Sequence, residues 1–415
     1  MLNLRHLVTQ RIYYGWYVVC AAFVVMLVGF ASAYSFSAFF PSLQAEFAAT
    51  RAEVSLVFSI GGSLYFFLGA LSGPLADRYG PRWICVFGLL VLGAGLTAAA
   101  YAGGLAMVYL GFGLGIGIGV GFSYVPSVGA VQPWFTERRG LASGLAVSGI
   151  GVGTMAGPIL ASYLIDAYGW RTALMCMGLG TLVLGVCAAL VLENRPDVRA
   201  GPGKNTHAST AADEFSLTLS QAIRTRPFLL LFVSAACLSF ALFVPFVHLV
   251  PYALDQGLTA ANGALVIGLV GVGSTLGRFA VGSVADRYGR LFVYVCAFVG
   301  VVLSFFVWLL SSGLWSLSFF ALGFGSFYGG FVALAPALTV DFFGTRTAGG
   351  IIGVLYSSVG IGTLIGPWFA GFVFDQLGTY GYAIAAGELA ALIAAGLAML
   401  LPEPRQWRSQ YQRDT

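Results

Sequence analysis

The sequence Gly73-Pro-Leu-Ala-Asp-Arg-Tyr-Gly80 recurs as Gly282-Ser-Val-Ala-Asp-Arg-Tyr-Gly289, 209 residues further along the chain. The same offset carries Gly151-Val-Gly-Thr-Met-Ala-Gly-Pro158 onto Gly360-Ile-Gly-Thr-Leu-Ile-Gly-Pro367, and it carries Asp166 onto Asp375. Three separate matches at one offset indicate that the two halves of the chain are copies of one structural unit.

Each copy consists mostly of long apolar segments. Of the 415 residues, 59% are hydrophobic and 9% are charged, against about 25% charged in a soluble domain, which excludes a water-soluble globule. Backbone groups in a bilayer must be paired within their own segment, so these segments must be helices. We predict an all-α integral membrane protein with twelve transmembrane helices in two pseudo-symmetric six-helix bundles. The spans lie at about 15–40, 53–76, 83–101, 104–132, 141–165, 170–192, 227–254, 260–285, 291–311, 314–340, 348–374 and 379–401.

A polar segment separates the sixth span from the seventh. It contains Gly201-Pro-Gly203 and most of the consecutive polar residues of the chain, a composition typical of a flexible connector. The predicted domains are therefore an N-terminal bundle at 1–192, a linker at 193–226, and a C-terminal bundle with its tail at 227–415.

Positive charge gathers on one side of the predicted membrane. If both termini lie on that side, 17 of the 20 basic residues lie there, whereas Arg51 and Arg171 lie opposite and Arg278 lies within a span. Loops rich in Lys and Arg are cytoplasmic. We therefore predict a multi-pass protein of the plasma (cytoplasmic) membrane, with the lipid bilayer as a partner and both termini in the cytoplasm.

The composition also excludes several kinds of partner. The sequence has no basic stripe interleaved with aromatic residues, so we predict no nucleic acid partner. Its six cysteines lie in apolar stretches, without a CxxC pair or a nearby pair of histidines, so we predict no metal site and no cofactor. The glycines of 113–121 lie inside a span with no preceding strand, which favours close helix packing over a nucleotide loop. We expect the chain to function as a monomer.

The repeated Gly-x-x-Ala-Asp-Arg-Tyr-Gly motif and the layout of two times six spans resemble the major facilitator superfamily over nearly the whole chain. Within it, Tyr14-Gly-Trp16, the segment Phe246–Asp255 and Arg278 resemble the monocarboxylate porters and their bacterial oxalate/formate-type relatives. This resemblance implies alternating access and proton-coupled movement of a small carboxylate such as lactate or pyruvate. Animal members carry a lysine where this chain has Tyr34 and an aspartate where it has Ser274, so proton coupling does not transfer directly.

Arg278 is the strongest indication of a binding site. An arginine at the centre of a transmembrane helix costs about 2.5 to 3.5 kcal/mol on insertion, and a guanidinium does not relieve this cost by losing a proton. The first six spans contain no acidic residue well inside the apolar region to pair with it. We predict that Arg278 faces a water-filled cavity, binds a carboxylate through two parallel hydrogen bonds, and takes part in proton coupling. The alternative is a permanent salt bridge.

His248 and Asp255 lie two helical turns apart in the seventh span and so share a face. Pro245 and Pro251 interrupt this helix, which is tolerated where a helix lines a cavity. We predict that Asp255 carries the proton and releases it when Arg278 approaches without substrate, and that His248 hydrogen-bonds the substrate's hydroxyl or keto oxygen. Alternatively, Asp255 marks the extracellular end of the helix and His248 is a packed polar residue.

Hydroxyl-bearing side chains within other spans complete the predicted substrate pocket. A small carboxylate is otherwise apolar, so aromatic walls with a few hydroxyls would suit it. With 34 Phe and 19 Tyr in the chain, simple packing is the alternative for each tyrosine. The predicted residues are Tyr34, Tyr124, Tyr328, Tyr356 and Ser357.

The repeated acidic-basic turns lie at the cytoplasmic boundary of the spans. Charges there complement helix dipoles, and we predict that they also latch a cytoplasmic gate that opens as the halves move. Loop capping alone is the alternative. The predicted gate residues are Gly73, Asp77, Arg78, Gly80, Arg82, Asp286, Arg287 and Arg290.

Other functions fit the sequence less well. A multidrug exporter of amphipathic cations would need acidic residues within the first-half spans, and a membrane enzyme would need a metal cluster, a nucleophile with its base or a large soluble domain. We therefore predict no catalytic residues. An anion exchanger of oxalate/formate type, or an exporter of another small organic acid, remains an alternative. A doubly charged substrate would favour a second fixed cation, so the single Arg278 favours a monoanion moving with a proton.

Overall fold

The protein is all-α, as the sequence predicts. A computed structural model describes residues 13–135, 139–193, 215–345 and 347–414, and these residues form helices without a strand. The helices of the first half are α1 (Tyr14–Tyr34), α2 (Phe36–Phe47), α3 (Arg51–Tyr79), α4 (Pro81–Ala100), α5 (Leu105–Val108), α6 (Gly115–Val131), α7 (Arg139–Gly180) and α8 (Val186–Val191). Those that follow are α9 (Leu219–Ala222), α10 (Arg226–Asp255), α11 (Ala260–Tyr288), α12 (Arg290–Leu309), α13 (Leu314–Phe343), α14 (Ala348–Leu377), α15 (Gly381–Met399) and α16 (Pro404–Asp414).

Twelve membrane crossings arise from eleven apolar helical runs in the described part of the chain. The run Leu141–Val191 has 51 residues and would measure about 77 Å if straight, against about 30 Å of bilayer hydrocarbon. It folds back at Gly169, whose φ of 79° and ψ of 159° are not helical. Glycine adopts this conformation without a steric penalty, so the run makes two crossings.

The sequence repeat is also a structural repeat. Helices α3 and α11 each have 29 residues and begin after Thr50 and Thr259, whose side chains each accept a hydrogen bond from the backbone N–H three residues later. Both helices end at the glycine of the quoted motif, Gly80 with φ of 88° and Gly289 with φ of 92°. Two halves with the same helix length, N-cap and positive-φ stop confirm the pseudo-symmetric architecture.

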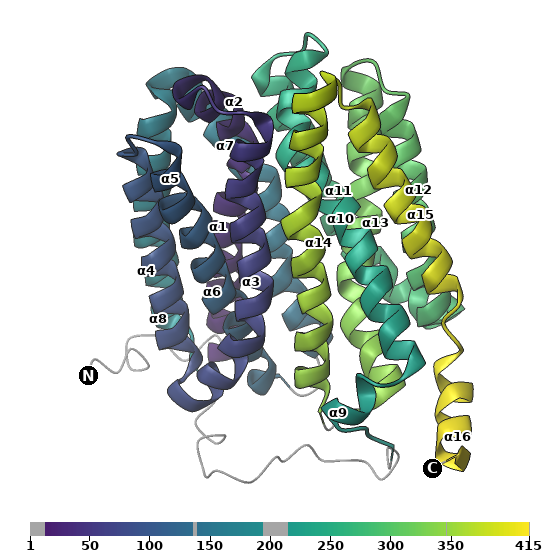
Figure 1. Cartoon of the computed structure of the whole chain (residues 1–415). Coiled ribbons are helices and arrows are strands. Elements are labelled where there is room, and N and C mark those ends of the chain that lie inside the picture. Colours follow the sequence, from purple (N-terminus) through teal and green to yellow (C-terminus); the bar gives the residue numbers. More distant parts are fainter. Residues whose placement is uncertain (1–12, 136–138, 194–214, 346, 415) are drawn as a thin grey trace.

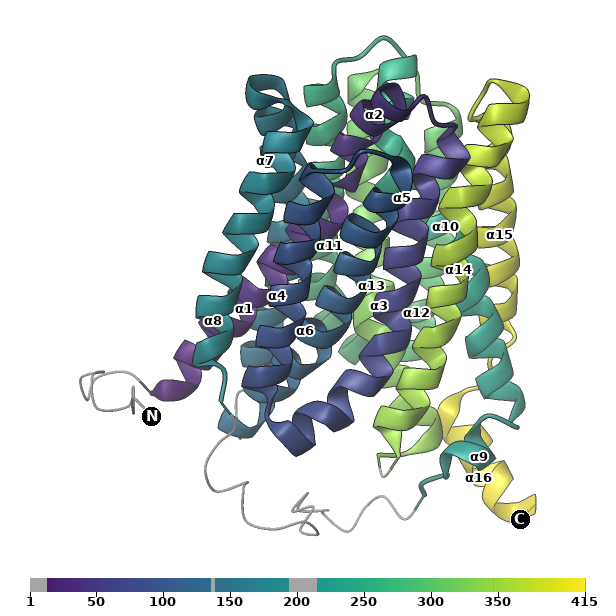
Figure 2. The same ribbon diagram turned by 60° about the vertical axis from the view of Figure 1, so that its left-hand side comes forward.

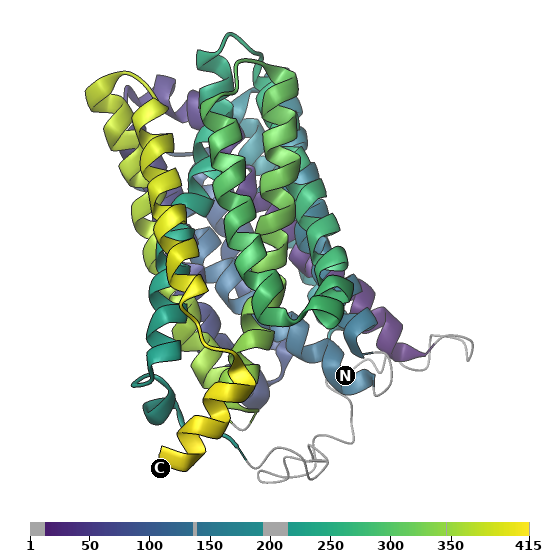
Figure 3. The same ribbon diagram turned by 90° about the vertical axis from the view of Figure 1, so that its right-hand side faces the viewer.

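The two bundles stand side by side, one built from α1–α8 and the other from α10–α15 (Figure 1). They meet where α3 packs against α14 and where α7 packs against α11; Figure 2 shows α3 and α14 adjacent from a second angle. Helix α2 lies at one end of the molecule, hereafter the α2 end. The C-terminal helix α16 lies at the other, the α16 end (Figures 1 and 3).

Glycines allow the closest helix contacts, as predicted for 113–121. A Cβ added to Gly119 would lie 2.5 Å from the Cβ of Leu92, and one added to Gly117 would lie 2.8 Å from the Cβ of Leu64. Such distances leave no room for a side chain. These glycines therefore join α6 to its neighbours.

The predicted linker is partly helical. Its residues 194–214 lie outside the described residues, but Thr218 and Gln221 form a reciprocal capping box that begins α9. Just before it, the backbone N–H of Leu217 donates to the carbonyl of Phe343 at the end of α13. The last part of the segment is thus attached to the second bundle, because capped helix ends and backbone hydrogen bonds hold it there.

Candidate functional site

A cavity of about 450 Å³ lies between the two bundles. Its walls come from α6, α7, α11, α13 and α14, so both halves contribute. It extends from Arg278 toward the α16 end, where Gln132, just after α6, and Ser143, near the start of α7, line it. A solute entering from the α16 end would therefore reach Arg278.

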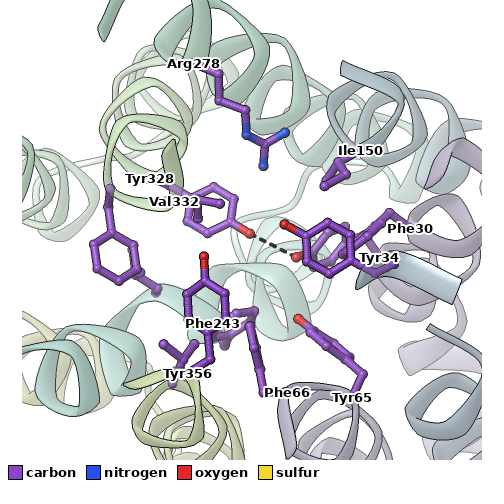
Figure 4. A pocket seen from close by; sticks show the side chains of 14 residues that line it. Phe30, Tyr34, Tyr65, Phe66, Ile150, Phe243, Arg278, Tyr328, Val332 and Tyr356 are labelled. Atoms are coloured by element: carbon purple, nitrogen blue, oxygen red, sulfur yellow. Dashed lines mark hydrogen bonds between the residues drawn. The ribbon is translucent and has the colours of Figure 1, made fainter. Parts of the chain in front are cut away.

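A narrower inner pocket of about 40 Å³ continues from this cavity and shares Arg278, Tyr124 and Tyr356 with it (Figure 4). Tyr34 and Tyr328 also line the inner pocket. The structure therefore brings Arg278 together with all four predicted tyrosines, which come from α1, α6, α13 and α14. Ser357 lies elsewhere: it lines neither cavity, and its hydroxyl donates to the carbonyl of Val354 in its own helix.

Arg278 points into the inner pocket, toward the hydroxyls of Tyr34 and Tyr328 (Figure 4). Its Nε and Nη1 atoms are buried and have no hydrogen-bond partner among the described residues. No described carboxylate forms an ion pair with it either. A guanidinium buried without a partner is costly, so the site is arranged for an anion that is not part of the chain.

A layer of aromatic side chains closes the pocket toward the α2 end. The hydroxyls of Tyr34 and Tyr328 lie 3.1 Å apart and join the first half to the second. The ring of Tyr34 stacks on Phe246 with 4.3 Å between centroids, and Phe36 and Phe40 behind it are 0% exposed. Among the described residues, these side chains therefore close the pocket toward the α2 end in this conformation.

Tyr65 is a lining residue that the sequence prediction missed. It lies on α3, its ring contacts Phe30 with 6.1 Å between centroids, and its buried hydroxyl has no hydrogen-bond partner among the described residues. Its position near the centre of the second span was the only available signal, and many aromatic residues share that signal.

His248 packs in the closed layer and lines neither cavity. It is 0% exposed, its Nε2 lies 2.8 Å from the carbonyl oxygen of Pro367 and 3.1 Å from Ser55 Oγ, and its Nδ1 lies 2.9 Å from the Tyr380 hydroxyl. The Tyr380 hydroxyl can donate its proton to Nδ1. With a proton on Nε2 for Pro367, the neutral imidazole is fully hydrogen-bonded.

Asp255 is the last residue of α10, at the α2 end, and the structure does not bring it to Arg278. Its two carboxylate oxygens instead accept hydrogen bonds from the guanidinium of Arg51, at 2.7 and 2.8 Å. Arg51 begins α3 in the other half. The sequence prediction missed this partner, although Arg51 is one of the two basic residues expected outside.

The predicted gate motif lies at the α16 end, and no described ion pair joins its residues across the halves. Gly73, Asp77, Arg78 and Gly80 lie in the last turns of α3 or just after it, and Asp286 and Arg287 lie in the last turn of α11. Arg82 bonds Glu193 at 3.5 Å within the first half, and Arg290 bonds Asp341 at 2.7 Å within the second. Among the described residues, no ion pair therefore latches the two halves at this end, toward which the cavity extends.

Sequence comparison decides the family. A model of the Major Facilitator Superfamily matches residues 21–290 and 263–414. The chain belongs to the major facilitator superfamily. This facilitator is 29% identical over 398 residues to monocarboxylate transporter 13 of Bos taurus. The alignment covers 94% of this chain and 89% of that relative. It is 28% identical over 394 residues to monocarboxylate transporter 12-B of Danio rerio, with coverage of 88% and 82%.

Solved structures show the same fold. A bacterial homolog to the human lysosomal transporter Spinster, in an inward-facing and unoccupied conformation, matches this facilitator with a TM-score of 0.71 and 16% identity, over 95% of this chain and 98% of that one. The occupied form of that homolog gives a TM-score of 0.71 and 15% identity, with coverage of 94% and 97%. The resemblance to monocarboxylate porters within this superfamily is thus confirmed, and the protein is a transporter rather than an enzyme.

Proposed function

We propose that this protein is a secondary active transporter that moves a small monocarboxylate, such as lactate or pyruvate, together with a proton by alternating access. The observation that carries the proposal is the Arg278 guanidinium in a cavity between the two bundles, whose buried Nε and Nη1 atoms have no hydrogen-bond partner among the described residues. A carboxylate supplies two oxygens in the geometry that the planar guanidinium matches. Its remaining surface fits against aromatic walls.

A monoanion suits this cavity better than a dianion. Arg278 is the one charged side chain that lines either described cavity, so a dicarboxylate would leave one charge without a fixed partner. The names of the relatives, monocarboxylate transporters 12-B and 13, agree with this preference. Exchange of oxalate for formate is therefore the weaker candidate.

Asp255 is the proposed proton carrier, with Arg278 balancing the carboxylate so that the loaded cycle is electroneutral. Arg51 pairs with Asp255 in this conformation, so loading of the proton and separation of that pair are coupled steps. Contact between His248 and the substrate's hydroxyl or keto oxygen likewise needs a conformation in which Ser55 has moved away. These roles therefore belong to the state that opens at the α2 end.

The proposed orientation places the α16 end in the cytoplasm of a plasma (cytoplasmic) membrane, because basic residues gather there. The structure then represents the state open to the cytoplasm. In the opposite state, the acidic-basic turns of α3 and α11 approach and latch the cytoplasmic gate. Two bundles, at 1–192 and 227–415, rock about the site, and one chain suffices for transport.

Uptake of labelled pyruvate or lactate into proteoliposomes tests the proposal. We expect an inward proton gradient to accelerate uptake, Arg278→Gln to abolish it, and Arg405→Gln, which removes an exposed arginine of α16, to leave it unchanged. Uptake that ignores the pH gradient would contradict proton coupling. Full uptake by Arg278→Gln would contradict the substrate site.

A further inference from the structure

Arg51 makes an extensive set of contacts between the halves at the α2 end. Besides its two hydrogen bonds to Asp255, its guanidinium lies 3.6 Å from the ring centroid of Phe374 and 5.1 Å from that of Tyr380, both in the second half. Its side chain is 12% exposed, against 35% for Asp255. A bidentate pair with this little solvent is stronger than an ordinary surface salt bridge.

A second carboxylate holds the backbone at the same point. Asp375, near the end of α14, accepts hydrogen bonds from the backbone N–H of Arg51 at 2.9 Å and from that of Ala52 at 2.8 Å. These N–H groups begin α3 and have no partner within the helix, and the positive end of the helix dipole favours a carboxylate there. Two carboxylates of the second half therefore hold one helix terminus of the first.

The sequence repeat shows that the Arg51–Asp255 pair has no counterpart in the other half of the chain. The repeat offset places Ala260 of α11 at the position of Arg51, so the equivalent contact between α7 and α11 has no guanidinium. It places Glu46 at the position of Asp255, and Glu46 pairs with Arg171 within its own half at 2.8 Å. One of two pseudo-equivalent carboxylates therefore bridges the halves, and the other does not.

We propose that Arg51, together with Asp255 and Asp375, forms the latch that holds the α2 end closed, so that Arg51 is a positioning residue for transport. The proposal rests on the alternating-access function proposed above. Opening toward the α2 end must separate α3 from both α10 and α14, so it must break the two hydrogen bonds to Asp255 and the two to Asp375. A proton on Asp255 would remove the charge that holds Arg51, so neutralising Asp255 shifts the protein toward the state open at the α2 end.

Distances between spin labels at the α2 end test this latch without any transport assay. Gly103→Cys, in the loop after α4, and Ser312→Cys, in the loop after α12, place labels on exposed positions of the two halves. The full-length chain carries them in lipid nanodiscs, with its six native cysteines replaced by alanine. Pulsed electron spin resonance then gives the ratio of open to closed molecules.

We expect Asp255→Asn and Arg51→Gln to raise the ratio of open to closed molecules by about tenfold. This change lies between the small effect of losing an exposed ion pair and the large effect of losing a buried one. Arg51→Lys should give a smaller rise, because lysine keeps the positive charge but loses the planar guanidinium that donates two parallel hydrogen bonds to Asp255. Glu46→Gln is the matched control, since it removes a carboxylate at the equivalent position that does not bridge the halves, and it should leave the ratio unchanged.

Equal distance distributions for Asp255→Asn and Glu46→Gln would overturn the latch. If Asp255→Asn or Arg51→Gln unfolds the protein, Arg51→Lys is compared with the wild type instead. An unchanged ratio of open to closed molecules in Arg51→Lys would contradict the need for a bidentate pair. Absence of monocarboxylate uptake by the wild type would refute the proposed function, whereas a shifted distance ratio would still establish the latch.

Discussion

At the scale of single residues, Arg278 combines the right charge with the right geometry. Its charge attracts any anion, but the planar fork selects an anion with two oxygens. We expect Arg278→Lys to retain weak transport, with kcat/KM reduced by about 10- to 100-fold, because a point charge on a flexible stem does not replace two parallel hydrogen bonds. Proteoliposome uptake at several substrate concentrations checks this, and an Arg278→Lys rate equal to wild type would show that charge alone suffices.

The Tyr65 hydroxyl gives a second residue-scale prediction. It is buried and has no hydrogen-bond partner among the described residues, and such a group destabilises a protein by about 1 to 3 kcal/mol. We expect Tyr65→Phe to raise the melting temperature of the ligand-free protein and, if the hydroxyl binds substrate, to raise KM several-fold. Tyr34→Phe is the comparison, because its hydroxyl already bonds Tyr328 and its loss should lower the melting temperature. A lower melting temperature for Tyr65→Phe would contradict this account.

The sequence alone predicted that Arg278 lines a cavity, because a charge in the middle of an apolar span is conspicuous without any knowledge of its neighbours. It did not predict the partner of Asp255. Arg51 is the first residue of α3, and a charged residue at that position is typical of any helix end at the membrane surface. Only the packing of the two halves, which brings the start of α3 to the end of α10, makes the pair. His248 shows the reverse case, since its position suggested the substrate pocket but Ser55, Pro367 and Tyr380 bond it in the closed layer.

At the scale of elements, the position of Arg278 depends on how closely α11 approaches α13. A Cβ added to Gly277 would collide with the backbone of Ser326, and helix backbones do not yield as flexible side chains do. We expect Gly277→Ala to destabilise the protein by about 1 to 3 kcal/mol and to weaken substrate binding by displacing the adjacent arginine.

Thermal unfolding and substrate titration of the same sample measure both effects. Gly129→Ala in α6 is the control, because a Cβ added at Gly129 meets nothing within 4 Å. Equal behaviour of the two variants would show that close packing of α11 does not set the site. The sequence indicated the glycine contacts through small residues within spans, but their partner helices emerge only from the fold.

At the scale of the whole molecule, the repeat and the apolar spans were enough to predict two bundles and twelve crossings. The sequence could not predict which conformational state the structure shows, because the same residues must be compatible with the state open at the α16 end and with the state open at the α2 end. It also could not show that Arg51 pairs with Asp255 at the α2 end while no described ion pair joins the acidic-basic turns across the halves at the α16 end. Whether each end is open or closed depends on contacts between the bundles, and these contacts differ between the two conformational states. The helices within each bundle are the same in both states, so the sequence predicts them regardless of the state.

We propose that Arg278 binds the carboxylate of a monoanion, and ligand-dependent thermal stability tests this claim most directly. A ligand that prefers the folded protein stabilises it by about 2.7 kcal/mol at 100 times its Kd. We predict that pyruvate or lactate raises the melting temperature of the wild type with increasing concentration, that oxalate does so less, and that Arg278→Gln does not respond. Equal stabilisation of Arg278→Gln by pyruvate or lactate would contradict the claim.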